Sequence, residues 1–170
     1  MDCLASEIIE LSTRYNIFYF LTVGAIYRGW ARSASGDTAE GIPWIERGIR
    51  DFRATGVVPP LAYYLSLKAE ALYLTDRTSE ALEVIKEAEA TVERFGVRTS
   101  RAELHRLRGV FLTATGADEI EIEASFCEAI RTARAQKSIS LGKRAEGTYA
   151  EYQRQKASVS AGRGFRLPLW

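Results

Sequence analysis

The chain has 170 residues, 46% of them hydrophobic and 26% charged, and its formal net charge is +1 at pH 7. This composition can build a sizeable core and excludes a wholly disordered chain. Cys3 and Cys127 have no His or Cys at ligand spacing, which argues against a disulfide framework or a zinc site and favours a reducing, cytoplasmic setting.

Residues that tolerate a left-handed backbone recur every twenty positions, and they divide the chain into helices. These residues are Asn16, Gly36, Gly56, Asp76, Gly96 and Gly116. The segments between them are rich in Ala, Glu, Arg, Leu and Ile, which favour helix. The sequence predicts eight helices joined by short turns, over residues 3–15, 17–35, 38–55, 59–75, 78–95, 99–115, 118–136 and 138–155.

Local signals support several of these helix starts. Pro59 and Pro60 are expected in the first turn of a helix, where a missing N–H costs little. Asp118 precedes Glu121 by three residues and resembles a capping box. The second predicted helix contains the longest strongly apolar run, which is too short to span a bilayer and is interpreted as a buried helix.

The pattern repeats every forty residues, so each unit holds two helices. A small residue stands in the middle of each first helix, where it lets the partner helix approach: Gly29, Ala69 and Gly109. Each second helix has a predicted buried face at spacing i, i+4, i+7. These faces are Gly41, Ile45 and Gly48, then Ala81, Ile85 and Ala88, and, after a one-residue slip, Ile122, Phe126 and Ala129.

This arrangement of small and bulky residues resembles the tetratricopeptide (TPR) repeat over residues 17–136, although the period is longer than the usual ~34 residues. Segments such as Gly24 to Ala31 and Ala102 to Gly109 resemble the C-terminal repeat region of bacterial signalling proteins that carry a predicted ATPase, often behind an adenylate/guanylate cyclase or a DNA-binding domain. The resemblance implies an all-α, right-handed solenoid of antiparallel helix pairs. It also implies a regulatory or scaffolding segment, with the catalytic or nucleotide-binding parts of such proteins absent from this chain.

The repeat pattern predicts a helical domain over 1–155 and a basic tail over 156–170. Residues 1–15 match a second helix, with Met1, Ala5 and Ile8 on its buried face, so the chain is expected to be part of a larger protein. The four apolar residues of the tail are Phe165, Leu167, Leu169 and Trp170. The tail is expected to be disordered, to fold back over the end of the solenoid, or to drive dimerisation. Uncapped solenoid ends predict self-association.

Residues suited to chemistry are few. His105 is the only histidine, and its position favours a structural role over a catalytic one, because nothing nearby in the sequence supplies a nucleophile and an orienting group. Carboxylates such as Glu80, Glu83 and Glu87 are expected on solvated helix faces. The Gly-Arg-Gly segment at 162–164 lacks the features of a phosphate-binding loop. The sequence therefore predicts no catalytic, cofactor or metal site.

The concave groove of the predicted solenoid is the candidate binding surface, and the first helices would line it. The predicted contact residues are Trp30, Tyr63, Glu70, Tyr73, Glu103 and Arg106. Aromatic residues and Arg are typical anchors of binding surfaces. The alternative is that these aromatic side chains fill the core, with Trp30 between repeats. Trp44, Tyr15, Phe18 and Tyr19 are assigned to the core.

The predicted function is a non-catalytic scaffold that binds a protein or peptide. Three alternatives stay open. A small effector in the groove would make the chain a ligand-sensing domain that regulates an attached output domain. Residues 137–170 carry seven basic and two acidic residues, and nucleic-acid binding through this basic C-terminal region is the second, weaker alternative. An enzyme would have to use His105.

Overall fold

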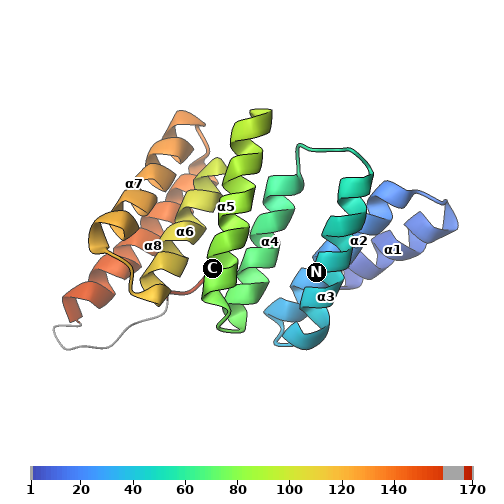
Figure 1. Ribbon diagram of the computed structural model, residues 1–170, viewed down its shortest axis with the longest axis horizontal. Helices are drawn as coiled ribbons and strands as arrows, with labels where there is room; N and C mark the ends of the chain where they lie inside the picture. Colours follow the sequence, from blue (N-terminus) through green and yellow to red (C-terminus); the bar gives the residue numbers. More distant parts are fainter. Residues whose placement is uncertain (1, 159–166, 170) are drawn as a thin grey trace. The chain divides into compact units, whose positions relative to one another are not determined.

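A computed structural model describes residues 2–158 and 167–169. Over these residues the chain forms eight α-helices and no strand (Figure 1). The helices are α1 (Asp2–Arg14), α2 (Phe18–Ala34), α3 (Thr38–Ala54), α4 (Leu61–Leu74), α5 (Thr78–Phe95), α6 (Arg101–Thr115), α7 (Glu119–Ala135) and α8 (Ile139–Ser158). The all-helical prediction is confirmed, and most predicted bounds lie within two residues of those observed.

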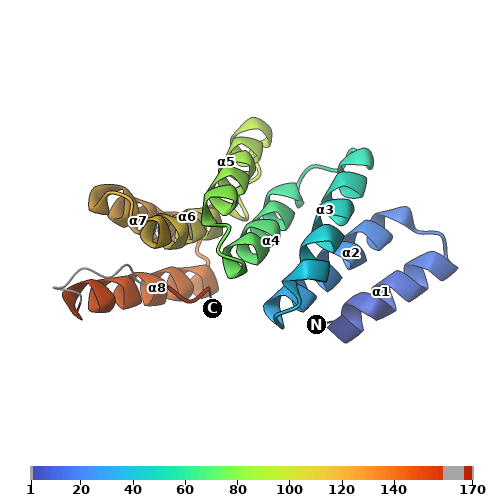
Figure 2. The ribbon, with the colours of Figure 1, turned by 60° about the horizontal axis from the view of Figure 1, so that its bottom comes forward.

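The helices fall into two compact units, Met1–Phe95 and Gly96–Trp170. Helix α8 ends at Ser158, three residues beyond the end predicted for the last helix. In unit 1 each helix from α1 to α5 packs against the next, and α2 also contacts α4 (Figure 2). In unit 2, α6 contacts both α7 and α8, and α7 contacts α8. Within each unit, therefore, first helices of neighbouring repeats touch each other as well as their own partners.

The turns confirm the twenty-residue spacing. All six predicted turn residues have positive φ angles, from 53° at Asn16 to 100° at Gly36. A seventh positive φ, 54°, occurs at Lys137, which is twenty-one residues after Gly116. This extra residue is the one-residue slip seen in the α7 sequence pattern. Lysine gives no turn signal, so this position was missed.

Small residues bring paired helices into close contact. A Cβ atom added at Gly29 would lie 2.5 Å from the carbonyl oxygen of Gly41, so the backbones of α2 and α3 almost touch there. At Gly109 an added Cβ would lie 2.7 Å from the ring of Phe126, which is fully buried on α7. Ala69 is also fully buried. The predicted i, i+4, i+7 faces of α3, α5 and α7 are buried throughout, as expected.

Two predicted helix starts differ in detail. Pro60 is the N-cap of α4 and Pro59 precedes it, so both prolines lie before the first helical turn rather than in it. The side chain of Asp118 accepts a hydrogen bond from the backbone N–H of Ile120 at 2.8 Å, while Glu121 pairs with Arg108 instead of completing a capping box. No helix in the described part of the chain is long and apolar enough to cross a bilayer.

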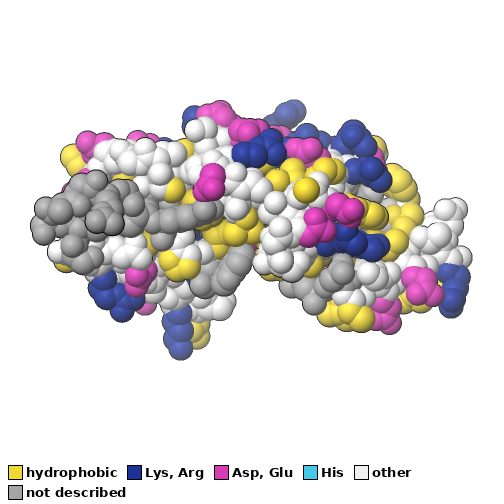
Figure 3. All heavy atoms as spheres, turned by 90° about the horizontal axis from the view of Figure 1, so that it is seen from below, with side chains coloured by type: hydrophobic (Ala, Val, Ile, Leu, Met, Phe, Trp, Pro, Cys, Tyr) yellow, Lys and Arg dark blue, Asp and Glu magenta, His cyan; other side chains and the backbone are white. Residues whose placement is uncertain are grey.

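The core assignment of Tyr15 and Phe18 was wrong, because they are 65% and 53% exposed. They flank the turn between α1 and α2, and α1 packs against no helix other than α2 among the residues that the structure describes. Tyr19 and Trp44 are half-buried. Figure 3 shows hydrophobic side chains on the surface of the part of unit 1 that carries α1 and α2. Apolar spacing alone does not distinguish a covered helix face from an uncovered one.

The close approach at Gly109 gives the first testable prediction. Gly109→Ala is expected to lower the free energy of unfolding by about 1–3 kcal/mol, because the buried ring of Phe126 has no room to retreat. Gly147→Ala on α8 is the matched control, since an added Cβ there meets nothing within 4 Å. It is expected to stabilise by about 0.5–1 kcal/mol through helix propensity. Urea unfolding measures the change in unfolding free energy for both variants. Equal changes at the two positions would contradict the close contact between Gly109 and Phe126.

Candidate functional site

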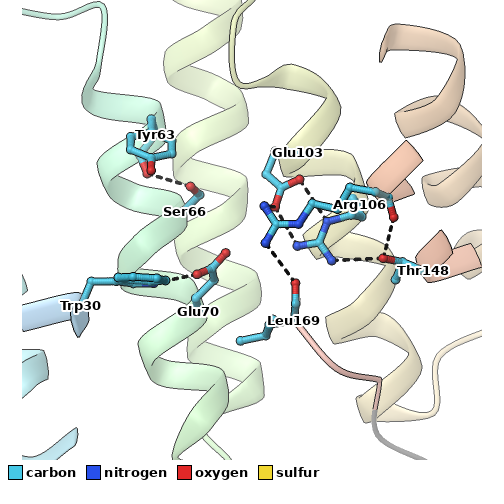
Figure 4. A network of polar contacts seen from close by, with 9 residues as sticks. Trp30, Tyr63, Ser66, Glu70, Glu103, Arg106, Thr148 and Leu169 are labelled. Carbon is cyan, nitrogen blue, oxygen red and sulfur yellow. Dashed lines mark hydrogen bonds and ion pairs between the residues drawn. The ribbon is translucent and has the colours of Figure 1, made fainter. Parts of the chain in front are cut away.

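The predicted contact residues form two separate groups, one in each compact unit. Unit 1 holds Trp30 on α2 and Tyr63, Glu70 and Tyr73 on α4. Unit 2 holds Glu103 and Arg106 on α6. Figure 4 shows the polar contacts of these residues except Tyr73.

In unit 1 the indole of Trp30 contacts the carboxylate of Glu70. The Nε1–H of Trp30 donates a hydrogen bond to Oε2 of Glu70 at 2.7 Å (Figure 4). The two residues are forty positions apart and occupy equivalent places in neighbouring repeats. Glu70 is only 4% exposed and Trp30 is half-buried. A buried carboxylate needs such a donor, so this contact stabilises the α2–α4 pairing and holds both side chains in place.

Next to this contact lies a cluster of tyrosine rings. Tyr63 is 39% exposed, and its ring centroid lies 6.5 Å from that of Tyr27 on α2 and 6.0 Å from that of Tyr64. Tyr64 is buried edge-on against Phe52, with centroids 4.9 Å apart. Burial and then the neighbouring Tyr19 and Tyr27 raise the pKa of Tyr64 well above its usual value, so it stays protonated. Tyr63 is the member of the cluster that faces solvent.

Tyr73 does not project into an open groove. It is buried near the C-terminal end of α4, a helix that packs against α2, α3 and α5. With neighbours on three sides, α4 has few faces left open, and ten of its fourteen residues are buried. The helical spacing that predicted a groove position for Tyr73 is the same for residues that face a groove and for residues that face the core. In this structure Tyr73 is a packing residue.

Glu103 and Arg106 form a buried ion pair instead of a pair of groove contacts. Nε and Nη2 of Arg106 donate to the two carboxylate oxygens of Glu103 at 3.0 and 2.7 Å, which is a bidentate pairing. Arg106 is only 1% exposed and Glu103 is also buried. They lie three residues apart on α6, which α7 and α8 both contact. The expectation that these side chains face an open surface is therefore corrected.

Helix α8 adds two residues to this network that the sequence analysis did not identify. Nη1 of Arg106 donates to Oγ1 of Thr148 at 3.3 Å, and Nη1 of Arg144 lies 3.3 Å from Oε1 of Glu103. Nη2 of Arg144 donates to the backbone carbonyl of Leu169 at 3.3 Å. Arg144 is forty-one residues after Glu103, which is the repeat period plus the slip. If the one-residue slip had been included when α8 was aligned with α6, the alignment would have placed the basic Arg144 opposite the acidic Glu103.

His105 is half-buried on α6, and burial lowers its pKa below the usual value. The nearby Glu128 opposes this shift, while Arg101, Arg108 and Arg131 add to it. Near neutral pH the imidazole is therefore uncharged. Cys127 is exposed, and no group of three metal-ligating side chains occurs among the residues that the structure describes.

The buried ion pair gives a second prediction. Arg106→Met is expected to lower the free energy of unfolding by about 3 kcal/mol, because it removes the bidentate partner of the buried carboxylate of Glu103 and leaves it to the longer contact with the more exposed Arg144. Arg131→Met is the control: Arg131 also pairs with a glutamate three residues earlier, but its side chain is 73% exposed. The control is expected to change stability far less. Similar losses in urea unfolding would show that burial of the pair contributes nothing.

His105 gives a third prediction, on pH. Because its pKa is lowered in the folded chain, the unfolded chain binds a proton more readily, and stability falls as the pH drops below the unfolded value of about 6.5. The wild-type chain is expected to lose more unfolding free energy than His105→Gln between about pH 7.5 and about pH 5.5. Urea unfolding at both pH values measures this difference. Identical losses in the two proteins would contradict the assignment of His105 as a half-buried imidazole with a lowered pKa.

No protein-family profile matches the sequence. No solved structure matches it. The chain is 26% identical over 148 residues to a protein of Rhizobium meliloti (strain 1021) that is described as uncharacterized. The match covers 87% of this chain and 14% of the relative, so the chain corresponds to a small part of that longer protein.

Proposed function

We propose that the chain is a non-catalytic interaction segment that binds a protein or peptide through the aromatic surface of unit 1. We call this the Tyr63 surface, and it consists of Tyr63 on α4 and Tyr27 on α2. The observation that carries the proposal is an exposed aromatic residue, Tyr63, on the same helix as Glu70, whose hydrogen bond with Trp30 ties α4 to α2.

Rigid aromatic residues are effective anchors because they bury much area and lose little conformational freedom on binding. The ring centroid of Tyr63 lies 6.0 Å from that of the buried Tyr64, and the backbone carbonyl of Tyr63 accepts a hydrogen bond from Ser66 at 2.7 Å. The contact between Trp30 and Glu70 holds α2 beside α4, so the two tyrosines of the surface keep their spacing. A partner therefore meets a preorganised surface, which lowers the entropic cost of binding.

The proposal includes the finer features that the resemblance implies: a continuous, right-handed, TPR-like solenoid that acts as a scaffold or regulatory part of a larger signalling protein. The fold supports this through its forty-residue register and its helix pairs. The match to 14% of a longer relative is compatible with a segment of a larger protein.

Spin labels on the two native cysteines test the continuity of this solenoid, because Cys3 lies in unit 1, Cys127 lies in unit 2, and both are free and exposed. A continuous solenoid predicts a single narrow distribution of label-to-label distances in a pulsed electron paramagnetic resonance experiment. A broad distribution from an otherwise folded chain would show that the two units move independently.

The binding proposal is tested by quantitative capture of proteins from a bacterial lysate. Tyr63→Ala is expected to lose at least one partner that the wild-type chain retains, with a reduction of about tenfold or more for a hot-spot residue. Phe95→Ala is the control, because Phe95 is an exposed aromatic residue of the same unit that lies outside the Tyr63 surface.

Circular dichroism should show unchanged helix content in both variants. A partner lost from both variants equally would point to nonspecific aromatic binding. Capture that is identical for the wild type and Tyr63→Ala would contradict the proposal for this surface.

A further inference from the structure

The segment Leu167–Leu169 follows α8 after residues 159–166 and is held against unit 2. Leu167 and Leu169 are both buried, whereas Pro168 between them is exposed. This alternation is typical of an extended strand-like segment that lays every second side chain into a surface. Pro168 restricts Leu167 to extended conformations and so favours this shape before binding.

The segment contacts α8 through the backbone carbonyl of Leu169 and through Pro168. Its carbonyl at Leu169 accepts the hydrogen bond from Arg144, and Figure 4 shows this oxygen directed at the guanidinium group. Pro168 lines a hollow on α8 together with Arg144, Thr148 and Glu151. Arg144 in turn pairs with Glu103, so the contact made by the segment continues into the buried Glu103–Arg106 pair.

From this arrangement we propose that Leu167–Leu169 is an internal ligand, and that it occupies a binding site on unit 2 for an extended Leu-Pro-Leu type of peptide. The site recognises two apolar side chains at positions i and i+2 and the carbonyl that Arg144 binds. Recognition by backbone and alternate side chains does not depend on whether the peptide belongs to the same chain.

Burial of the two leucine side chains and the hydrogen bond from the partly exposed Arg144 favour docking, while ordering of the segment opposes it. The covalent connection through residues 159–166 compensates by keeping the segment at a high effective concentration near the site. A partner peptide with the same chemistry therefore competes with the internal ligand for the same surface. Free partner binds only the fraction of molecules from which the internal ligand has dissociated.

The test uses the full chain and a fluorescently labelled peptide with the sequence of residues 164–170. In the double variant Leu167→Asp, Leu169→Asp, the internal ligand no longer docks, and the peptide is expected to bind at least about tenfold more tightly than it binds the wild-type chain. Ile139→Asp is the matched control, because Ile139 is an exposed apolar residue of α8, and it is expected to bind like the wild type. Adding Arg144→Gln to the double variant is expected to weaken peptide binding.

Equal peptide affinity for the wild type and the double variant would overturn the proposal, as would absence of binding to a double variant with unchanged helix content. If the double variant loses helix content, it is replaced by the double variant Leu167→Ala, Leu169→Ala. This variant is also expected to bind the peptide more tightly than the wild-type chain does. A peptide carrying Asp at both leucine positions should not compete, and competition by it would also overturn the proposal. The assay concerns residues of unit 2 alone, so its result is independent of the Tyr63 surface in unit 1.

Discussion

The left-handed residue in each turn is the constraint on which the rest of the structure depends. It ends one helix and reverses the chain within a few residues, and it recurs at twenty-residue intervals from Asn16 to Gly116. Consecutive helices are therefore similar in length and pack as neighbours. Small residues then allow the pairs to approach closely, as Gly29 does against Gly41. Neither feature is sufficient alone, because a turn brings helices together only if their facing side chains leave room.

A consequence of this regularity is that equivalent positions in neighbouring repeats meet. Trp30 contacts Glu70 at the repeat period of forty, and Glu103 contacts Arg144 at the period plus the slip. Each of these polar contacts has a buried carboxylate as one partner, so it specifies register where apolar packing alone would tolerate sliding. They also connect structure with function. The first contact ties together α2 and α4, the two helices that carry Tyr27 and Tyr63, and Arg144 of the second contact also holds the carbonyl of Leu169.

The helices and their packed faces could be predicted because the turn residues and small residues are visible in the sequence. The turn at Lys137 could not, since lysine gives no turn signal. The burial of Tyr73 and Arg106 was missed for another reason: a side chain facing a groove and one facing a neighbouring helix have the same periodicity. Only the number of helices packed around α4 and α6 separates the two cases. The docking of Leu167 and Leu169 was one of three outcomes left open for the tail, and Phe165 and Trp170 lie outside the described residues.

The forty-residue register is tested most directly by a double-mutant cycle on Trp30→Phe and Glu70→Gln. If equivalent positions of α2 and α4 are in contact, the two substitutions are expected to show a coupling energy above about 0.5 kcal/mol in urea unfolding. Trp30→Phe combined with Glu121→Gln on α7 is the control and should be additive within about 0.3 kcal/mol. Additivity of the Trp30 and Glu70 substitutions would contradict the register and, with it, the preorganisation of the Tyr63 surface.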